Sequence, residues 1–172
     1  MRMTSCKAPS CGAIAPPIHL TTTFQHGPAA ERRAGFEYQR EANPTQARLE
    51  TAIAALEGGE AALAYASGMA AMYGLLESLP PGSHFLYPRD CYTGLRALAK
   101  EFLPERGISA DAVDMGDLAA VRAALQPATK LVWAETPSNP LLEVADIAGL
   151  AAIAKVHGAL LACDNTFATP VL

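Results

Sequence analysis

Charged residues are scarce in this chain, and the basic ones do not gather into runs. Lys, Arg, Asp and Glu make up 17% of the 172 residues, and the formal net charge is -4. Binding to the phosphates of nucleic acid needs a Lys/Arg patch, so a nucleic-acid partner is not expected. No apolar run reaches the roughly 18 residues that cross a bilayer, so a membrane partner is not expected either.

The beginning of the sequence, MRMTSCKAPSC, lacks the apolar core of a secretory signal, which favours a cytoplasmic location. Cys6, Cys11, Cys91 and Cys163 show no paired metal-ligand spacing. In a reducing cytosol we expect them to be free thiols and expect no metal site. Cys6 and Cys11 could share a metal, but no close pair of further ligands supports that alternative.

Residues 1–43 are poorly periodic, with Pro16-Pro17 and scattered Thr, and we expect an extended N-terminal arm. The only domain boundary that the sequence suggests lies near residue 44. Asn43-Pro44 is typical of a helix start, and Gly58-Gly59 predicts the end of that helix. A second helix is predicted within residues 65–82, which contain Ser67-Gly68 and are stopped by Pro80-Pro81-Gly82.

Strands and helices then alternate along residues 83–172. Half of the chain is apolar, which is enough for a sizeable core. This alternation predicts an α/β fold with a mostly parallel sheet and helices on both of its faces. The expected strands are 83–88, 107–113, 129–136 and 159–166. Three helices are expected between them: one over 92–102, one capped by Asp117 that ends near Leu125, and one from Asp146 to Gly158.

Polar residues follow two of the predicted strands. Glu135 ends one strand and is followed by Asn139, and Asp164 ends the last strand and is followed by Thr166. Ligands in open α/β sheets bind beyond the carboxyl ends of the strands, so these four residues could converge on one crevice. The alternative is structural: Asp164 would cap a turn, and Asn139 would shape a loop between prolines.

Two further features suit the same crevice. Ser67, Gly68 and Met69 open a helix, whose free N–H groups and dipole favour a phosphate, although a Ser-Gly pair is also an ordinary cap. The sequence has neither an ATP-binding P-loop nor a G-x-G-x-x-G motif. Tyr92 follows a predicted strand and could stack on a ring or simply pack. Pyridoxal 5'-phosphate would use the helix start, Tyr92 and Asp164 together.

Five stretches in order, APPIHLTTTF, FEYQREANPT, SGMAA, ETPSNPLLEVADIA and DNTFATP, resemble the γ-family of pyridoxal-phosphate enzymes of transsulfuration. That family includes cystathionine γ-synthases, γ-lyases and β-lyases and O-acylhomoserine sulfhydrylases. The resemblance covers the chain from Gly12 onward and corresponds to the N-terminal half of a member. It implies a fold-type-I, aspartate-aminotransferase-like large domain at 44–172, incomplete, with an inter-subunit arm at 1–43.

The resemblance also implies roles for individual residues. Gly68 and Met69, next to Ser67, would bind the cofactor phosphate. Tyr38 and Arg40 would bind the phosphate of the neighbouring subunit's cofactor in a homotetramer of paired dimers. Tyr92 would stack on the pyridine ring and assist proton transfer. Asn139 would approach the ring hydroxyl, Asp164 would pair with the ring nitrogen, and Thr166 would lie close to the ring.

Some residues depart from the family pattern. The Schiff-base lysine of the family lies in a Ser-x-Thr-Lys motif beyond the position of Asp164, and none of Lys7, Lys100, Lys130 and Lys155 is expected to replace it. Thr93 stands where members often have glycine, and it would be strained there if the position needs a positive φ. Gly94 stands where methionine γ-lyases carry cysteine, which argues against that activity.

The function implied is γ-replacement, or γ- or β-elimination, on cystathionine or an O-acylhomoserine, with this chain alone expected to be inactive. The alternative is a non-catalytic truncated homologue that serves as an interaction module or is a decayed remnant. A third class, a nucleotide-binding α/β module, would need a Gly-rich phosphate loop, and the sequence has none.

Overall fold

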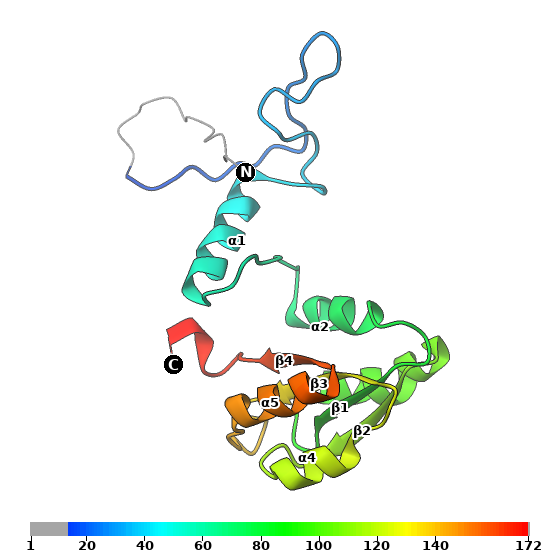
Figure 1. Cartoon of the computed structure of the whole chain (residues 1–172). Helices are drawn as coiled ribbons and strands as arrows, with labels where there is room; N and C mark the ends of the chain where they lie inside the picture. The colour runs from blue at the N-terminus through cyan, green and yellow to red at the C-terminus, as the bar shows by residue number, and fades with distance from the viewer. Residues whose placement is uncertain (1–13, 172) are drawn as a thin grey trace. The chain divides into compact units, whose positions relative to one another are not determined.

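The computed structural model describes residues 14–171, which form two compact units (Figure 1). The first unit ends at Ala64 and the second begins at Tyr65. Cys6, Cys11 and Lys7 lie outside the described residues. The boundary predicted near residue 44 separates an arm that would act between subunits from the α/β part of the chain. This division stays a prediction.

Part of the expected N-terminal arm, in the first unit, doubles back on itself, and its role between subunits stays a prediction. Antiparallel bridges join Thr23 to Tyr38 and His26 to Arg32. The rings of Phe24 and Phe36 pack with their centroids 5.4 Å apart. The poor periodicity of this segment gave no sign of these contacts.

Helix α1, Pro44–Leu56, begins where the sequence predicted. The Asn43 side chain accepts a hydrogen bond of 2.8 Å from the Thr45 N–H, and Pro44 occupies the first helical position. The helix ends just before Gly58, whose φ of 65° is left-handed and favours glycine. Local cap chemistry therefore determines both ends of this helix.

The second unit contains the predicted parallel sheet. Its strands are β1 (His84–Pro88), β2 (Ser109–Val113), β3 (Thr129–Glu135) and β4 (Leu160–Asp164), arranged in the order β2-β1-β3-β4. All three strand pairs are parallel. In the pairing of β3 with β4, Glu135 lies opposite Asp164, so the two carboxylates end neighbouring strands at the same edge.

Helices cover both faces of the sheet, as the alternation predicted (Figure 1). Alternate residues of β1 show why: Phe85 and Tyr87 face one core cluster, and Leu86 faces the other. The first face packs against α2 (Gly68–Glu77), α3 (Thr93–Ala97), the π-helix Leu98–Phe102 and the 3-10 turn Leu103–Arg106. The second packs against α4 (Leu118–Ala124) and α5 (Ile147–His157).

The chain leaves β1 toward the first face and leaves β3 toward the second. The helix that follows β1 contributes Leu95 to one cluster, and the helix that follows β3 contributes Leu150 to the other. The loops after these two neighbouring strands therefore diverge, which is the topological switch point where α/β sheets bind ligands.

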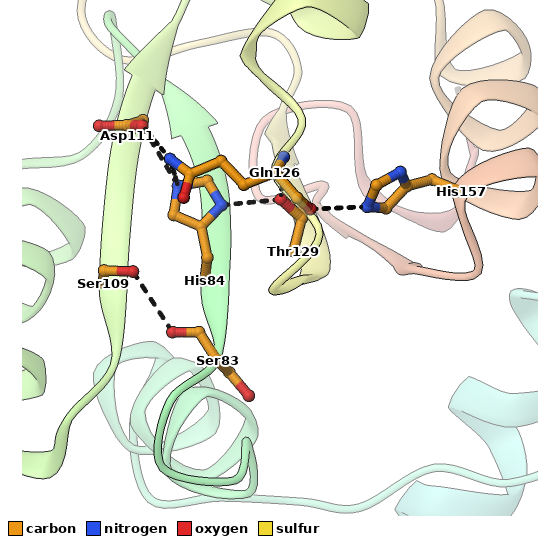
Figure 2. A network of polar contacts seen from close by, with 7 residues as sticks. All are labelled: Ser83, His84, Ser109, Asp111, Gln126, Thr129 and His157. Carbon is orange, nitrogen blue, oxygen red and sulfur yellow. Dashed lines mark hydrogen bonds and ion pairs between the residues drawn. The ribbon is translucent and has the colours of Figure 1, made fainter.

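At the opposite, amino end of the strands, a polar network surrounds His84 (Figure 2). The His84 imidazole is 1% exposed, with Nδ1 2.8 Å from Thr129 Oγ1 and Nε2 3.3 Å from Asp111 Oδ2. Gln126 donates to the same Asp111 oxygen over 2.9 Å, and His157 Nε2 lies 2.9 Å from the Gln126 carbonyl. Burial lowers the pKa of His84, and Asp111 opposes that effect.

This network predicts a pH dependence of stability. Because the pKa of His84 is lower in the folded chain than in the unfolded chain, protonation favours unfolding. The stabilisation is complete above the unfolded pKa of about 6.5 and is lost as the pH falls. The free energy of unfolding, measured with urea, should therefore fall more between about pH 8 and about pH 5 in the wild type than in His84→Asn.

Ser109→Ala is the matched control, because Ser109 belongs to the same network and carries no titratable group (Figure 2). It should keep the pH dependence of the wild type. An unchanged pH dependence in His84→Asn would contradict the assignment of this effect to His84.

Candidate cofactor site

All the predicted site residues of the second unit line one cavity at the carboxyl edge of the sheet. The cavity has a volume of about 340 Å³, which lies in the range of small-molecule sites. It is lined by Ser67, Gly68, Met69, Met72, Tyr92, Glu135, Pro137, Asn139, Asp164, Thr166 and Phe167. The convergence of Glu135, Asn139, Asp164 and Thr166 that the strand ends predicted is present.

The amino terminus of α2 forms one side of the cavity. The Ser67 hydroxyl caps the helix by accepting a 3.1 Å hydrogen bond from the Ala70 N–H. The N–H groups of Gly68 and Met69, which precede that cap bond, have no partner among residues 14–171. Two free N–H groups at the start of a ten-residue helix suit an anion such as phosphate.

Asp164 presents a carboxylate at another side of the cavity. One of its oxygens, Oδ1, accepts from the Thr166 N–H over 3.0 Å and from the Thr166 hydroxyl over 2.5 Å. The other oxygen has no hydrogen-bond partner in the described part of the chain. Thr166 therefore orients Asp164 and leaves one oxygen for a ligand cation.

Tyr92 lies at the rim, at the residue before α3, and is 42% exposed. Its ring lies so close to Gly94 that a Cβ there would come within 2.5 Å of Tyr92 Cε1 and 2.3 Å of Met69 Sδ. Glycine at position 94 is thus required for the ring to lie here. Thr93 is the first residue of α3 and is not among the residues with positive φ, so the conditional expectation of strain at Thr93 is not met.

Glu135 is the best-buried polar residue of the cavity and was not assigned a role from sequence. It is 6% exposed and accepts hydrogen bonds from the Tyr92 N–H over 2.9 and 3.1 Å and from the Asn139 N–H over 2.8 Å. Burial raises its pKa, the two N–H donors oppose this, and Asp164 and Asp90 add to the increase. Its place at a strand end was the only sequence signal.

Tyr38 and Arg40 belong to the first unit. The Arg40 guanidinium carbon lies 4.5 Å from the centroid of the Tyr38 ring, a cation–π contact that keeps the two side chains together. Their predicted partner is the phosphate of a neighbouring subunit's cofactor, and that role stays a prediction.

Other reactive groups lie outside the cavity. Lys100, Lys130 and Lys155 are exposed, and no lysine in the part of the chain that the structure describes lines the cavity. Cys91 is a buried free thiol whose pKa is raised by burial to about 11, so it is no nucleophile at neutral pH. Residues 14–171 contain no group of three or more His, Cys, Asp or Glu able to hold a metal. The helices in that range are all too short or too polar to span a membrane.

The fold and the cavity define an α/β cofactor-binding protein, with free N–H groups, an aromatic ring and a carboxylate around one space. The sequence model of the family described as "Cys/Met metabolism PLP-dependent enzyme" matches residues 2–172. The chain belongs to this family, whose cofactor is pyridoxal 5'-phosphate. The residues of the cavity fit that cofactor, because donors for a phosphate and an acceptor for a ring cation flank an aromatic ring.

Curated relatives agree with this assignment. The chain is 43% identical over 159 residues to a probable cystathionine gamma-synthase of Herpetosiphon aurantiacus, covering 92% of this chain and 50% of the relative. It is 42% identical to the cystathionine gamma-synthase of Mycobacterium leprae, covering 95% of this chain and 42% of that relative. It is also 42% identical to a cystathionine beta-lyase of Lactococcus lactis subsp. cremoris, covering 94% and 42%. The chain thus spans about half or less of the length of these relatives.

Solved structures show the same likeness. The crystal structure of metB from Corynebacterium glutamicum matches with a TM-score of 0.89 and 40% identity, covering 92% of this chain and 42% of that one. The cystathionine gamma-lyase from Lactobacillus plantarum, complexed with L-serine, matches with a TM-score of 0.87 and 42% identity, covering 93% and 42%.

The position of Gly94 gives a prediction for the cavity. Gly94→Ala should displace the Tyr92 ring or the Met69 side chain and weaken binding of pyridoxine 5'-phosphate by about tenfold, equivalent to about 1.4 kcal/mol. This probe has the ring and phosphate of the cofactor without the aldehyde that would react with exposed lysines. Equilibrium dialysis measures the affinity.

Gly59→Ala, where the nearest atom to a new Cβ is 3.5 Å away, is the control. Equal affinity in Gly94→Ala would contradict the placement of Tyr92.

Proposed function

We propose that this chain provides a large part of the cofactor site of a pyridoxal-phosphate-dependent transsulfuration enzyme. The reaction would be γ-replacement, or γ- or β-elimination, on cystathionine or an O-acylhomoserine. The observation that carries the proposal is the single cavity with free helix N–H groups at one side and a free Asp164 oxygen at another. The names of the relatives, gamma-synthase, gamma-lyase and beta-lyase, support the substrate class.

In this proposal the amino terminus of α2 binds the phosphate. The N–H groups of Gly68 and Met69 donate to phosphate oxygens, and the dipole of the ten-residue helix adds a favourable field. The absence of a Cβ at Gly68 lets an anion approach closely, since the space around that position is open. Ser67 keeps the helix terminus in shape through its cap bond to the Ala70 N–H.

Tyr92 and Asn139 hold the ring. Tyr92 would stack on the pyridine ring, and its phenol would assist proton transfer. The Asn139 side chain lies on the loop after β3 and donates to the ring hydroxyl. Thr166 fixes the Asp164 carboxylate through its hydroxyl and N–H.

Asp164 keeps the pyridine nitrogen protonated. The cofactor, when bound, accepts the electrons released when bonds at the substrate's Cα and Cβ are broken, and a protonated ring nitrogen strengthens that effect. Opposite unit charges about 4 Å apart attract by about 4 kcal/mol at an effective dielectric constant near 20, which equals about three pKa units. Asp164 is half-buried, so solvent screening reduces this value.

The Schiff-base lysine is proposed to come from outside the described residues, because Lys100, Lys130 and Lys155 do not line the cavity. This chain alone would then be inactive. Tyr38 and Arg40 are proposed to contact the cofactor of a second copy, in a homotetramer of paired dimers. The cytoplasmic location also stays a prediction.

The role of Asp164 can be tested through the ring itself. Asp164→Asn removes the charge and keeps the shape, so the pKa of the ring nitrogen of bound pyridoxine 5'-phosphate should fall by at least about one unit. The absorption of the bound probe, recorded against pH, measures that pKa. In an assembled enzyme that contains the lysine, Asp164→Asn should abolish turnover of cystathionine and O-acylhomoserines.

Glu101→Gln removes one negative charge from an exposed position of the same unit and serves as the control. The proposal fails if Asp164→Asn leaves the ring titration unchanged, or shifts it no more than Glu101→Gln does.

A further inference from the structure

Two carboxylates tie together the loops that diverge at the switch point. Glu135 ends β3, and it accepts hydrogen bonds from the Tyr92 N–H in the loop after β1 and from the Asn139 N–H in its own loop. Tyr92 and Asn139 lie 43 and four residues from Glu135 in sequence, so one side chain fixes two separate segments. Both segments contribute residues to the cavity.

Asp90 makes the reciprocal connection. It lies in the loop after β1, and its Oδ2 accepts from the Ser138 hydroxyl and from the Leu141 N–H, the latter over 3.0 Å, both in the loop after β3. Ser138 is 2% exposed, and its hydroxyl accepts in turn from the Glu143 N–H over 3.0 Å. Glu135 at the end of β3 thus holds a donor of the loop after β1, and Asp90 in that loop holds donors of the loop after β3.

We propose that Glu135 is a positioning residue for the cofactor: its carboxylate sets the separation of Tyr92 and Asn139, with Asp90 holding the far side of the same two loops. The inference rests on the proposed function, because it concerns the ring that Tyr92 and Asn139 would hold.

The geometry of Glu135 supports a positioning role over a general structural one. Beyond the ends of β1 and β3 the loops diverge to opposite faces, so no ladder of backbone hydrogen bonds continues between them. The Glu135 carboxylate replaces that ladder, and it does so at the two residues that flank the ring position. Burying a carboxylate is costly, and only its N–H donors compensate for that cost at this site.

The length of the side chain and its charge can be separated experimentally. Glu135→Gln keeps the reach, because its Oε1 can still accept from the Tyr92 nitrogen at 3.1 Å and from the Asn139 nitrogen at 2.8 Å. Its NH₂ takes the place of Oε2, which lies 2.9 Å from the Tyr92 nitrogen, so that one acceptor contact is lost. Glu135→Asp keeps the charge but is one methylene shorter and cannot hold both N–H groups. If positioning is the role, the Gln variant should resemble the wild type more closely than the Asp variant.

The test combines amide hydrogen exchange, read residue by residue by NMR, with the affinity for pyridoxine 5'-phosphate, both on the chain as it is. In Glu135→Asp, exchange at the Tyr92 and Asn139 amides should accelerate by about 10- to 100-fold and the affinity should fall by about tenfold. In Glu135→Gln, which loses only the Oε2 contact with the Tyr92 N–H, both quantities should change less than in Glu135→Asp. Unchanged exchange at the amides of β3 shows that each variant is folded.

Two controls accompany these variants. Glu143→Ala removes an exposed carboxylate from the same loop and should change neither quantity. Asp90→Ala should accelerate exchange at the Leu141 amide, because that N–H donates to Asp90.

The outcomes separate the possible accounts. Wild-type behaviour of Glu135→Asp together with an impaired Glu135→Gln would mean that charge matters and position does not, which overturns the proposal. Accelerated exchange without a loss of affinity would also overturn it, since the two loops would then be held for no benefit to the ring.

If the wild-type chain binds no probe, the proposed function fails for this chain and the cofactor role of Glu135 fails with it. Exchange alone then decides whether Glu135 holds the loops.

Discussion

The parallel pairing of β3 with β4 and of β1 with β3 is the constraint on which the candidate site depends. Parallel strands end at a common edge, so the loops after β1 and β3 and the end of β4 bring Tyr92, Asn139 and Asp164 to one cavity. The pairing of β1 with β3 is stabilised by burial on both faces, whereas the residues of β4 are exposed or half-buried. Phe85 and Leu131 pack under α2 and α3, and Leu86 packs under α4 and α5.

The two edges of the sheet use polar groups in different ways. At the amino edge, His84 and Thr129 are buried and satisfied by their neighbours, so that end of the sheet is closed. At the carboxyl edge, the Gly68 N–H and one Asp164 oxygen have no partner among the described residues. Gly68 is exposed and Asp164 is half-buried, so water can bind these groups in the free chain, and a ligand can take the place of that water. The imbalance between the edges is the physical reason to place the cofactor at the carboxyl edge.

Local features of the fold could be predicted from sequence because each depends on a few adjacent residues. Asn43, Ser67, Asp117 and Asp146 cap their helices as expected, and Gly158 ends α5 with a left-handed φ. The presumed helix at 92–102 changes to a π-helix at Leu98, and the helix around Ser67 is shorter than the segment predicted for it. These differences concern the length of elements and leave their order unchanged.

Contacts between distant segments could not be predicted in the same way. The residues around the cavity were found from strand ends and a helix start, but nothing in the sequence indicated that Glu135 accepts from the Tyr92 backbone. Nor did it indicate that the Met69 side chain lies against Gly94, or that Phe24 packs on Phe36 in the arm. Each depends on how separate segments come together, which periodicity and capping do not report.

The most direct test of the central claim is an NMR titration of the isotope-labelled chain with pyridoxine 5'-phosphate. The account predicts that the largest amide shifts occur at Gly68 and Met69, where the phosphate would bind, with smaller shifts at Tyr92, Asn139 and Thr166 around the ring. Inorganic phosphate should shift only the first pair. Shifts spread over other surfaces, or none at the start of α2, would contradict the assignment of this cavity to the cofactor.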